Sequence, residues 1–151
     1  MFSNLNTAFQ NITSKDKNED EYEGEDIQAV IILLLEACQI DGDTGKVELE
    51  YIKKILVNKF NFTSDQAENN LLEALEKSDK RVEIFSQIKI ILNEMNHEER
   101  IDVIEMMWGV ILSDGVVDDF EANLMRRMNG LLYVSGAESA SAKQRALSQT
   151  K

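Results

Sequence analysis

Apolar residues recur every three or four positions along most of this chain, which is the spacing of one face of an α-helix. The pattern predicts about seven helices, at residues 25–40, 47–59, 63–78, 81–95, 97–113, 119–129 and 135–147. The first predicted helix is apolar on almost every side, so we expect it at the centre of the fold. The others each show one apolar face, and we expect Leu72 and Phe85 to point inward. The chain contains no proline, which also favours an all-α fold.

Residues at helix-capping spacing mark several of the predicted boundaries. Gly115 follows Asp114 at the end of an apolar helix, where glycine can take the left-handed conformation that closes a helix. Asp118 and Glu121 then form a capping pair for the next helix, which Gly130 is expected to close. The capping-box spacing recurs at Thr63 with Gln66 and at Asn96 with Glu99. These signals indicate short connections between consecutive helices.

The chain matches itself when it is displaced by 73 positions. Asp41-Gly42 then falls on Asp114-Gly115, and Glu48 falls on Glu121 without a gap. Apolar residues meet apolar residues for several turns on either side of this match. We interpret the match as two helix pairs related by an approximate two-fold axis, with the apolar first helix of each pair at the centre. Chance similarity between amphipathic helices is the alternative.

Residues 1–25 differ in character from the rest of the chain. Phe2, Leu5, Phe9 and Ile12 recur at helical spacing, which predicts a short helix that either docks on the bundle or lies on a membrane surface. No basic residue precedes Lys15, and this weakens the membrane alternative and excludes a secretory signal. Residues 13–26 are polar and acidic, as in a flexible linker. We therefore expect a helical domain at 26–147, preceded by residues 1–25 and followed by a frayed tail at 148–151.

The charge of the chain narrows the choice of partners. Its formal net charge is −12 and its pI is about 4.5, so nucleic acid would be repelled. Cys38 is the one cysteine and His97 the one histidine, which excludes an internal disulfide and an ordinary zinc site. A single cysteine fits a reducing compartment, and we expect a cytoplasmic protein, with membrane association through residues 1–12 as the alternative. Glu99 and Glu105 are expected on a charged helical surface with Glu98.

Clustered carboxylates in the two Asp-Gly turns are the candidate metal ligands. The first turn offers Asp41, Asp43 and Glu48, and the second offers Asp114, Asp118 and Glu121. Carboxylate oxygens suit calcium or magnesium, with water completing the coordination shell. The second turn is the better candidate because it has both a cap residue and further acids. Capping and turn formation alone also explain these residues, and that structural alternative stays open.

Asp-Gly followed by glutamate seven residues on occurs twice, at Asp41 and at Asp114. Residues 96–108 contain a Glu-Glu-Arg…Trp segment, and residues 131–146 form a distinctive tail. In these three features the chain resembles the tellurite-resistance TerB-like family. The resemblance covers about residues 26–147 and implies a single-domain, all-α bundle of about seven helices with an internal pseudo-two-fold repeat. It also implies paired acidic turns that hold a divalent metal, although Gly45 stands where the second turn has Asp118.

These features favour a non-enzymatic module that binds an unknown protein partner and a divalent cation, as an accessory protein of a tellurite-resistance or stress response. The alternative is a hydrolase that uses the clustered carboxylates as metal ligands or as general acid and base. The sequence lacks a nucleophile constellation and a phosphate-cradling glycine loop, and its histidine is remote from the acids. We therefore predict a protein that is not an enzyme.

Overall fold

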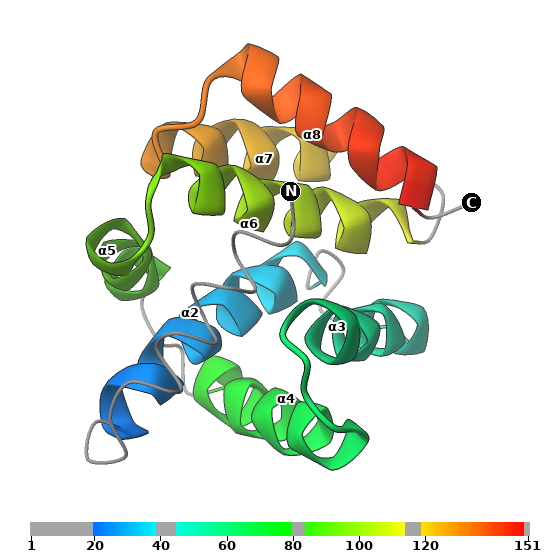
Figure 1. Ribbon diagram of the computed structural model, residues 1–151. Coiled ribbons are helices and arrows are strands. Elements are labelled where there is room, and N and C mark those ends of the chain that lie inside the picture. The colour runs from blue at the N-terminus through cyan, green and yellow to red at the C-terminus, as the bar shows by residue number, and fades with distance from the viewer. Residues whose placement is uncertain (1–19, 39–44, 80–83, 114–118, 150–151) are drawn as a thin grey trace.

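The computed structural model describes residues 20–38, 45–79, 84–113 and 119–149 (Figure 1). These residues form seven α-helices and, within the described ranges, no strand. The helices are α2 (Asp20–Cys38), α3 (Lys46–Lys59), α4 (Ser64–Asp79), α5 (Ile84–Glu94), α6 (His97–Leu112), α7 (Asp119–Leu131) and α8 (Gly136–Gln149). The predicted all-α fold is confirmed. The predicted helix over residues 1–12 lies outside the described residues, as do Gly42 and Gly115.

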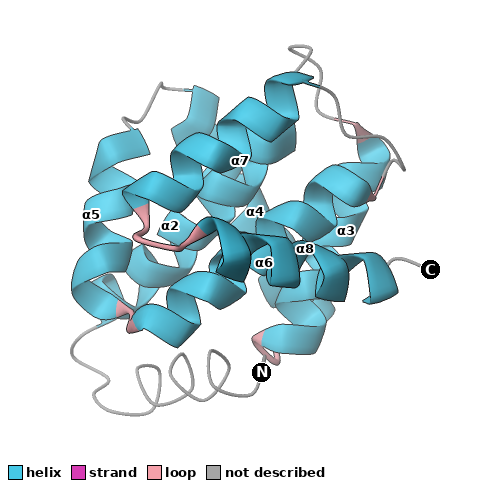
Figure 2. Ribbon diagram, turned by 90° about the horizontal axis from the view of Figure 1, so that it is seen from above, coloured by secondary structure: helices cyan, strands magenta, loops and turns pink. Residues whose placement is uncertain are grey.

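Helices α2 and α6 form the centre of the molecule. α2 packs against α3, α4, α5 and α6, while α6 packs against α2, α3, α7 and α8 (Figures 1 and 2). Every residue from Asp26 to Leu35 is buried, as is every residue from Asp102 to Leu112. Two helices without a solvent face must lie inside a bundle, because burial of apolar surface is the main driving force of folding. No helix in the described part is long and apolar enough to cross a membrane.

The helix boundaries follow the same offset as the sequence match. α3 begins at Lys46, and α7 begins 73 positions later at Asp119. α2 and α6, the helices that precede them, are the two central helices. The helix starts agree with this offset, and both the internal repeat and its two-fold axis stay predictions.

Three capping boxes fix the starts of helices. The Asn96 carboxamide oxygen accepts from the Glu99 N–H at 2.9 Å, and the Glu99 carboxylate accepts from the Asn96 N–H at 2.9 Å. Thr63 and Gln66 exchange the equivalent bonds before α4 at 3.1 and 2.9 Å. Both boxes confirm the prediction. A third box, between Ser135 and Glu138 before α8, escaped the sequence analysis.

Two predicted boundaries differ from the structure. α2 begins at Asp20, before the expected start at residue 25, because acidic residues favour the positive end of the helix dipole. α7 continues through Gly130, and Tyr133 instead takes the left-handed conformation with φ 56°. The Val134 N–H then donates to the Asn129 carbonyl oxygen at 2.8 Å, which closes the helix end without glycine.

Several side chains lie on a different side of their helix than expected. Leu72 is 54% exposed and Phe85 is 57% exposed, so both inward predictions are wrong. Each neighbours residues that face α2, and successive residues of a helix point about 100° apart, so one of two adjacent apolar residues is left outside. Glu99 and Glu105 were expected on the surface and are buried. The capping-box hydrogen bonds hold Glu99 against the start of α6. Glu105 is buried by contacts with α8, as described below.

Candidate functional site

The six predicted metal ligands divide into two groups. Asp41, Asp43, Asp114 and Asp118 lie outside the described residues. Glu48 and Glu121 are described, and each is the third residue of its helix, α3 and α7 respectively. Glu48 is partly buried, whereas Glu121 is only 5% exposed. Both glutamates therefore stand in the first helical turn, directly after the two acidic turns in sequence.

Gly45 allows the Glu48 carboxylate to fold back over the start of α3. Gly45 is the N-cap of this helix and has an extended backbone, with φ −69° and ψ 149°. A Cβ atom at Gly45 would collide with the Glu48 carboxylate. The glycine thus leaves room for the acid beside the N-terminus of α3, where the helix dipole favours negative charge. The counterpart of Gly45 in the second turn is Asp118, so the two turns differ in sequence at this position.

Both glutamates act electrostatically on one thiol at the end of α2. Burial raises the pKa of Cys38 to about 12, and the negative charges of Glu48 and Glu121 add to the increase. The Cys38 thiol donates to the Leu34 carbonyl oxygen at 3.4 Å. A thiol with such a pKa stays protonated at neutral pH and is neither a nucleophile nor a metal-binding thiolate. The thiol marks a position that two acids 73 residues apart in sequence both reach electrostatically.

No cluster of three metal-ligating side chains occurs among the residues that the structure describes. Glu48 and Glu121 also do not line either of the two surface hollows found there. One acid from each predicted group therefore lies within electrostatic range of Cys38. It does not test the remaining four acids.

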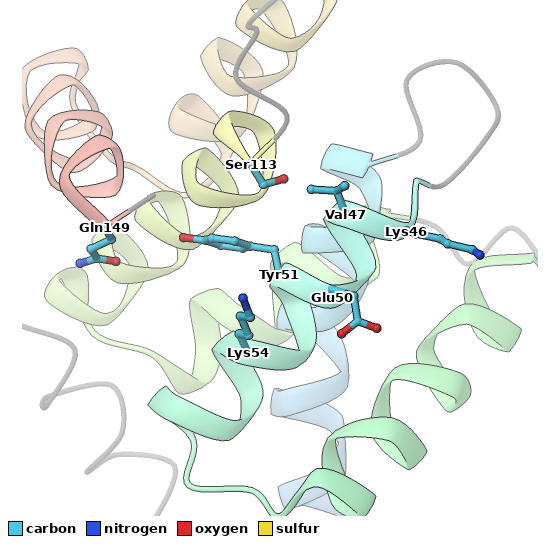
Figure 3. A pocket seen from close by; sticks show the side chains of 7 residues that line it. All are labelled: Lys46, Val47, Glu50, Tyr51, Lys54, Ser113 and Gln149. Carbon is cyan, nitrogen blue, oxygen red and sulfur yellow. The ribbon is translucent and has the colours of Figure 1, made fainter. Parts of the chain in front are cut away.

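A hollow of about 560 Å³ lies between α3 and the C-terminal ends of α6 and α8 (Figure 3). Its lining residues are Lys46, Val47, Glu50, Tyr51, Lys54, Ser113 and Gln149. A second hollow of about 340 Å³ shares three of these and adds Ile55, Asn58 and Lys59. Together the two hollows form a groove along α3, which we call the α3–α8 groove. The sequence analysis missed it, although Val47, Tyr51, Lys54 and Asn58 recur at helical spacing.

A buried acid lies near the same corner of the molecule. Asp102 is 1% exposed, and neither of its carboxylate oxygens has a hydrogen-bond partner in the described part of the chain. Burial raises its pKa to about 7, the negative charge of Glu105 adds to this, and Arg145 and Lys59 oppose it. Burial also lowers the pKa of Lys59 to about 8, against the effect of Glu105 and Asp102. These pKa shifts arise from the packing of segments that are distant in sequence, so no local sequence pattern predicts them.

Comparisons with known proteins give the family. No curated protein matches the chain. A solved structure of a protein of unknown function from Porphyromonas gingivalis W83 is similar with a TM-score of 0.60 and 20% identity, covering 80% of this chain and 89% of that one. At this identity the likeness shows the fold alone. The family model described as tellurite resistance protein TerB matches residues 27–144, most of the chain. The chain therefore belongs to the TerB family.

Proposed function

We propose that this protein is a non-enzymatic module whose two acidic turns together bind one divalent cation, calcium or magnesium, and that it recruits a protein partner beside this site. Membership of the TerB family supports a role in a tellurite-resistance-like response. The observation that carries the proposal is that Glu48 and Glu121, each the third residue of its helix, both lie within electrostatic range of the Cys38 thiol. Two acids from distant turns that act on one atom favour a single shared site over two separate ones.

The chemistry of the two glutamates suits a hard cation. Each stands in the first turn of a helix, and further acids lie a few residues before them in sequence, at Asp43 and Asp118. Carboxylates that gather repel one another, and a cation with oxygen ligands relieves this repulsion. Chain connectivity supports the arrangement, because Asp118 is only three residues from Glu121 and Asp43 is five residues from Glu48.

Exposed apolar residues beside the glutamates support the recruitment of a partner. Val47 is 58% exposed and Phe120 is 59% exposed, and each directly precedes one of the two glutamates. Large apolar side chains that stay exposed beside charged residues are common in interaction surfaces. A cation bound between the two turns would hold the starts of α3 and α7 together and fix the positions of both side chains.

The test is the melting temperature with calcium or magnesium. We expect millimolar concentrations of one of these ions to raise it by a few degrees, as binding to the folded state alone requires. The double variant Asp114→Ala, Glu121→Ala should abolish this rise in melting temperature. The pair Asp65→Ala with Glu94→Ala removes two acids elsewhere and should preserve it.

Calorimetric titration separates a shared site from two independent ones. A shared site predicts one ion per chain. It also predicts a large loss of affinity in Glu48→Gln, although this substitution removes a carboxylate from the first acidic turn only. A wild-type melting curve that ignores both ions would contradict the proposal. Two ions per chain with unequal affinities would contradict the shared site while leaving cation binding intact.

A further inference from the structure

The α3–α8 groove is basic in a strongly acidic chain. Lys46 and Lys54 line it, and neither forms an ion pair with another described residue. Glu50 is the acid in the lining, and its carboxylate lies 3.7 Å from the Lys53 ammonium group. Figure 3 shows that carboxylate turned away from Tyr51, while the Lys54 side chain extends toward the tyrosine ring. The Lys46 side chain points away from Tyr51 in the same view, so Lys54 is the nearer of the two lysines to the ring. Charges are screened over about 8 Å at physiological ionic strength, so distant acids of this chain, whose net charge is −12, act only weakly here.

Tyr51 adds a neutral hydrogen-bond donor to the groove. Its hydroxyl has no hydrogen-bond partner among the described residues, and its ring lies across the groove (Figure 3). Burial raises the pKa of Tyr51, and the charge of Glu105 adds to this, so the hydroxyl keeps its proton at neutral pH. The ring packs on Gly109 of α6, where a Cβ atom would stand 2.5 Å from the tyrosine oxygen. The donor is therefore held in place by packing and is not taken up by another group.

The rest of the lining suits an apolar group next to an anion. Val47 contributes an apolar side chain that is 58% exposed and that lines the same hollow as Tyr51. The carbonyl end of α6 would ordinarily repel an anion. Here the Val110 carbonyl oxygen already accepts from the Ser113 N–H at 3.2 Å and from its hydroxyl at 2.6 Å. Hydrogen bonds within the protein therefore already reduce the partial negative charge at the C-terminal end of α6.

We infer that the α3–α8 groove binds a small organic anion, a phosphate monoester or a carboxylate attached to an apolar group. The Lys54 ammonium and the Tyr51 hydroxyl donate to the anionic oxygens, Lys59 lies further along the groove, and Lys46 lies at its rim. The apolar part packs between Val47 and the tyrosine ring. A hollow of about 560 Å³ is within the usual size range of small-ligand sites. Glu48 and Glu121 do not line the groove, so this inference is independent of cation binding.

The experiment is a titration of the full chain, followed by the amide chemical shifts of α3 and α8. The probes are phenyl phosphate, benzoate and inorganic phosphate. Phenyl phosphate or benzoate should shift residues that line the groove, and the stronger of the two identifies the anionic group. Inorganic phosphate should bind about five-fold or more weakly, because it lacks the apolar part. Shifts that are absent with both aromatic probes, or that lie away from the groove, would overturn the inference.

Matched variants separate a built site from general attraction to lysine. Lys54→Gln should weaken binding of the preferred probe about ten-fold, and Tyr51→Phe about three-fold, since each removes a donor to the anion. Tyr51→Phe keeps the ring against Gly109, so its fold should be preserved, and circular dichroism checks this. Lys89→Gln removes one exposed lysine from α5 and should leave the affinity unchanged. Equal losses in Lys54→Gln and Lys89→Gln would overturn the inference.

Discussion

α4 and α8 are each the last of three helices that follow in order, α2–α3–α4 and α6–α7–α8, yet different forces hold them. α4 buries Ala67, Leu71 and Ala74 and packs on α2 and α3. A polar link to α2 is made by the Gln28 carboxamide, which donates to the Asn70 carbonyl oxygen at 2.9 Å. The attachment of α4 is therefore mainly apolar and tolerates changes in side-chain chemistry that preserve volume.

α8 packs closely on α6, and directed polar contacts add to this packing. Its buried residues are Ser139, Ala142 and Ala146, which offer little apolar area. The Trp108 indole N–H donates to the Ser139 hydroxyl at 3.0 Å, and the Arg145 guanidinium donates to the Glu105 carboxylate at 2.5 Å. The Glu138 carboxylate lies 2.7 Å from a His97 ring nitrogen. A helix with small side chains can slide on its neighbour, and these contacts fix its register.

The largest effect should come from breaking the buried ion pair of α8. Arg145→Ala leaves the Glu105 carboxylate, which is 1% exposed on its side chain, without its cation. We expect the free energy of unfolding to fall by about 3 kcal/mol, the usual cost of an uncompensated buried charge. The matched change Lys53→Ala removes the Lys53–Glu68 pair, whose side chains are 30% and 46% exposed, and should cost less than about 1 kcal/mol. Equal losses in urea denaturation would refute the distinction.

A smaller effect is expected from truncating the apolar side of α4. Leu71→Ala opens a cavity against α2 and should cost about 2–3 kcal/mol. Its neighbour Leu72 is 54% exposed, and Leu72→Ala should change stability by less than about 0.5 kcal/mol. Thermal denaturation of the two variants measures both changes. A Leu72→Ala variant that loses as much as Leu71→Ala would mean that α4 is rotated from the described orientation.

The smallest effect depends on pH. The pKa of Asp102 is about 7 in the folded protein, above its ordinary value of 3.8. Between these values the unfolded state gives up the proton while the folded state keeps it, so stability falls as pH rises and levels off above about pH 7. Asp102→Asn should therefore raise the free energy of unfolding at about pH 8, by on the order of 2 kcal/mol, and change it little at about pH 4.

The control for the pH effect is Glu98→Gln, which alters an exposed acid on the same helix. It should leave the pH profile of stability unchanged. If Asp102→Asn shifts the whole profile by one constant amount, the carboxyl group does not titrate between these values and the predicted linkage is wrong.

Much of the fold follows from the sequence because its signals are local. The apolar run of α2 and the capping boxes at Thr63 and Asn96 depend on residues a few positions apart. The burial of Glu105 depends on Arg145, which is 40 positions away, and no local pattern reveals that pairing. The left-handed Tyr133 also escaped prediction, since glycine at position 130 is the stronger local signal.

The candidate sites show the same division between local and distant information. The self-match of the sequence predicted that Glu48 and Glu121 occupy equivalent positions, and both stand third in their helices. Their common approach to Cys38 depends on how three helix ends meet. The α3–α8 groove joins residues as distant as Lys59 and Gln149, whose side chains lie 3.2 Å apart. Such a surface is visible only after the chain has folded.

The α3–α8 groove depends on Gly109, a residue that does not line it. The ring of Tyr51 occupies the space that a side chain at position 109 would need, so the sizes of these two residues are linked. An alanine at 109 would require a smaller residue at 51, and the groove would lose its aromatic wall and its hydroxyl together. Among related chains, the joint occurrence of glycine at one position and tyrosine at the other would therefore mark those that retain this groove.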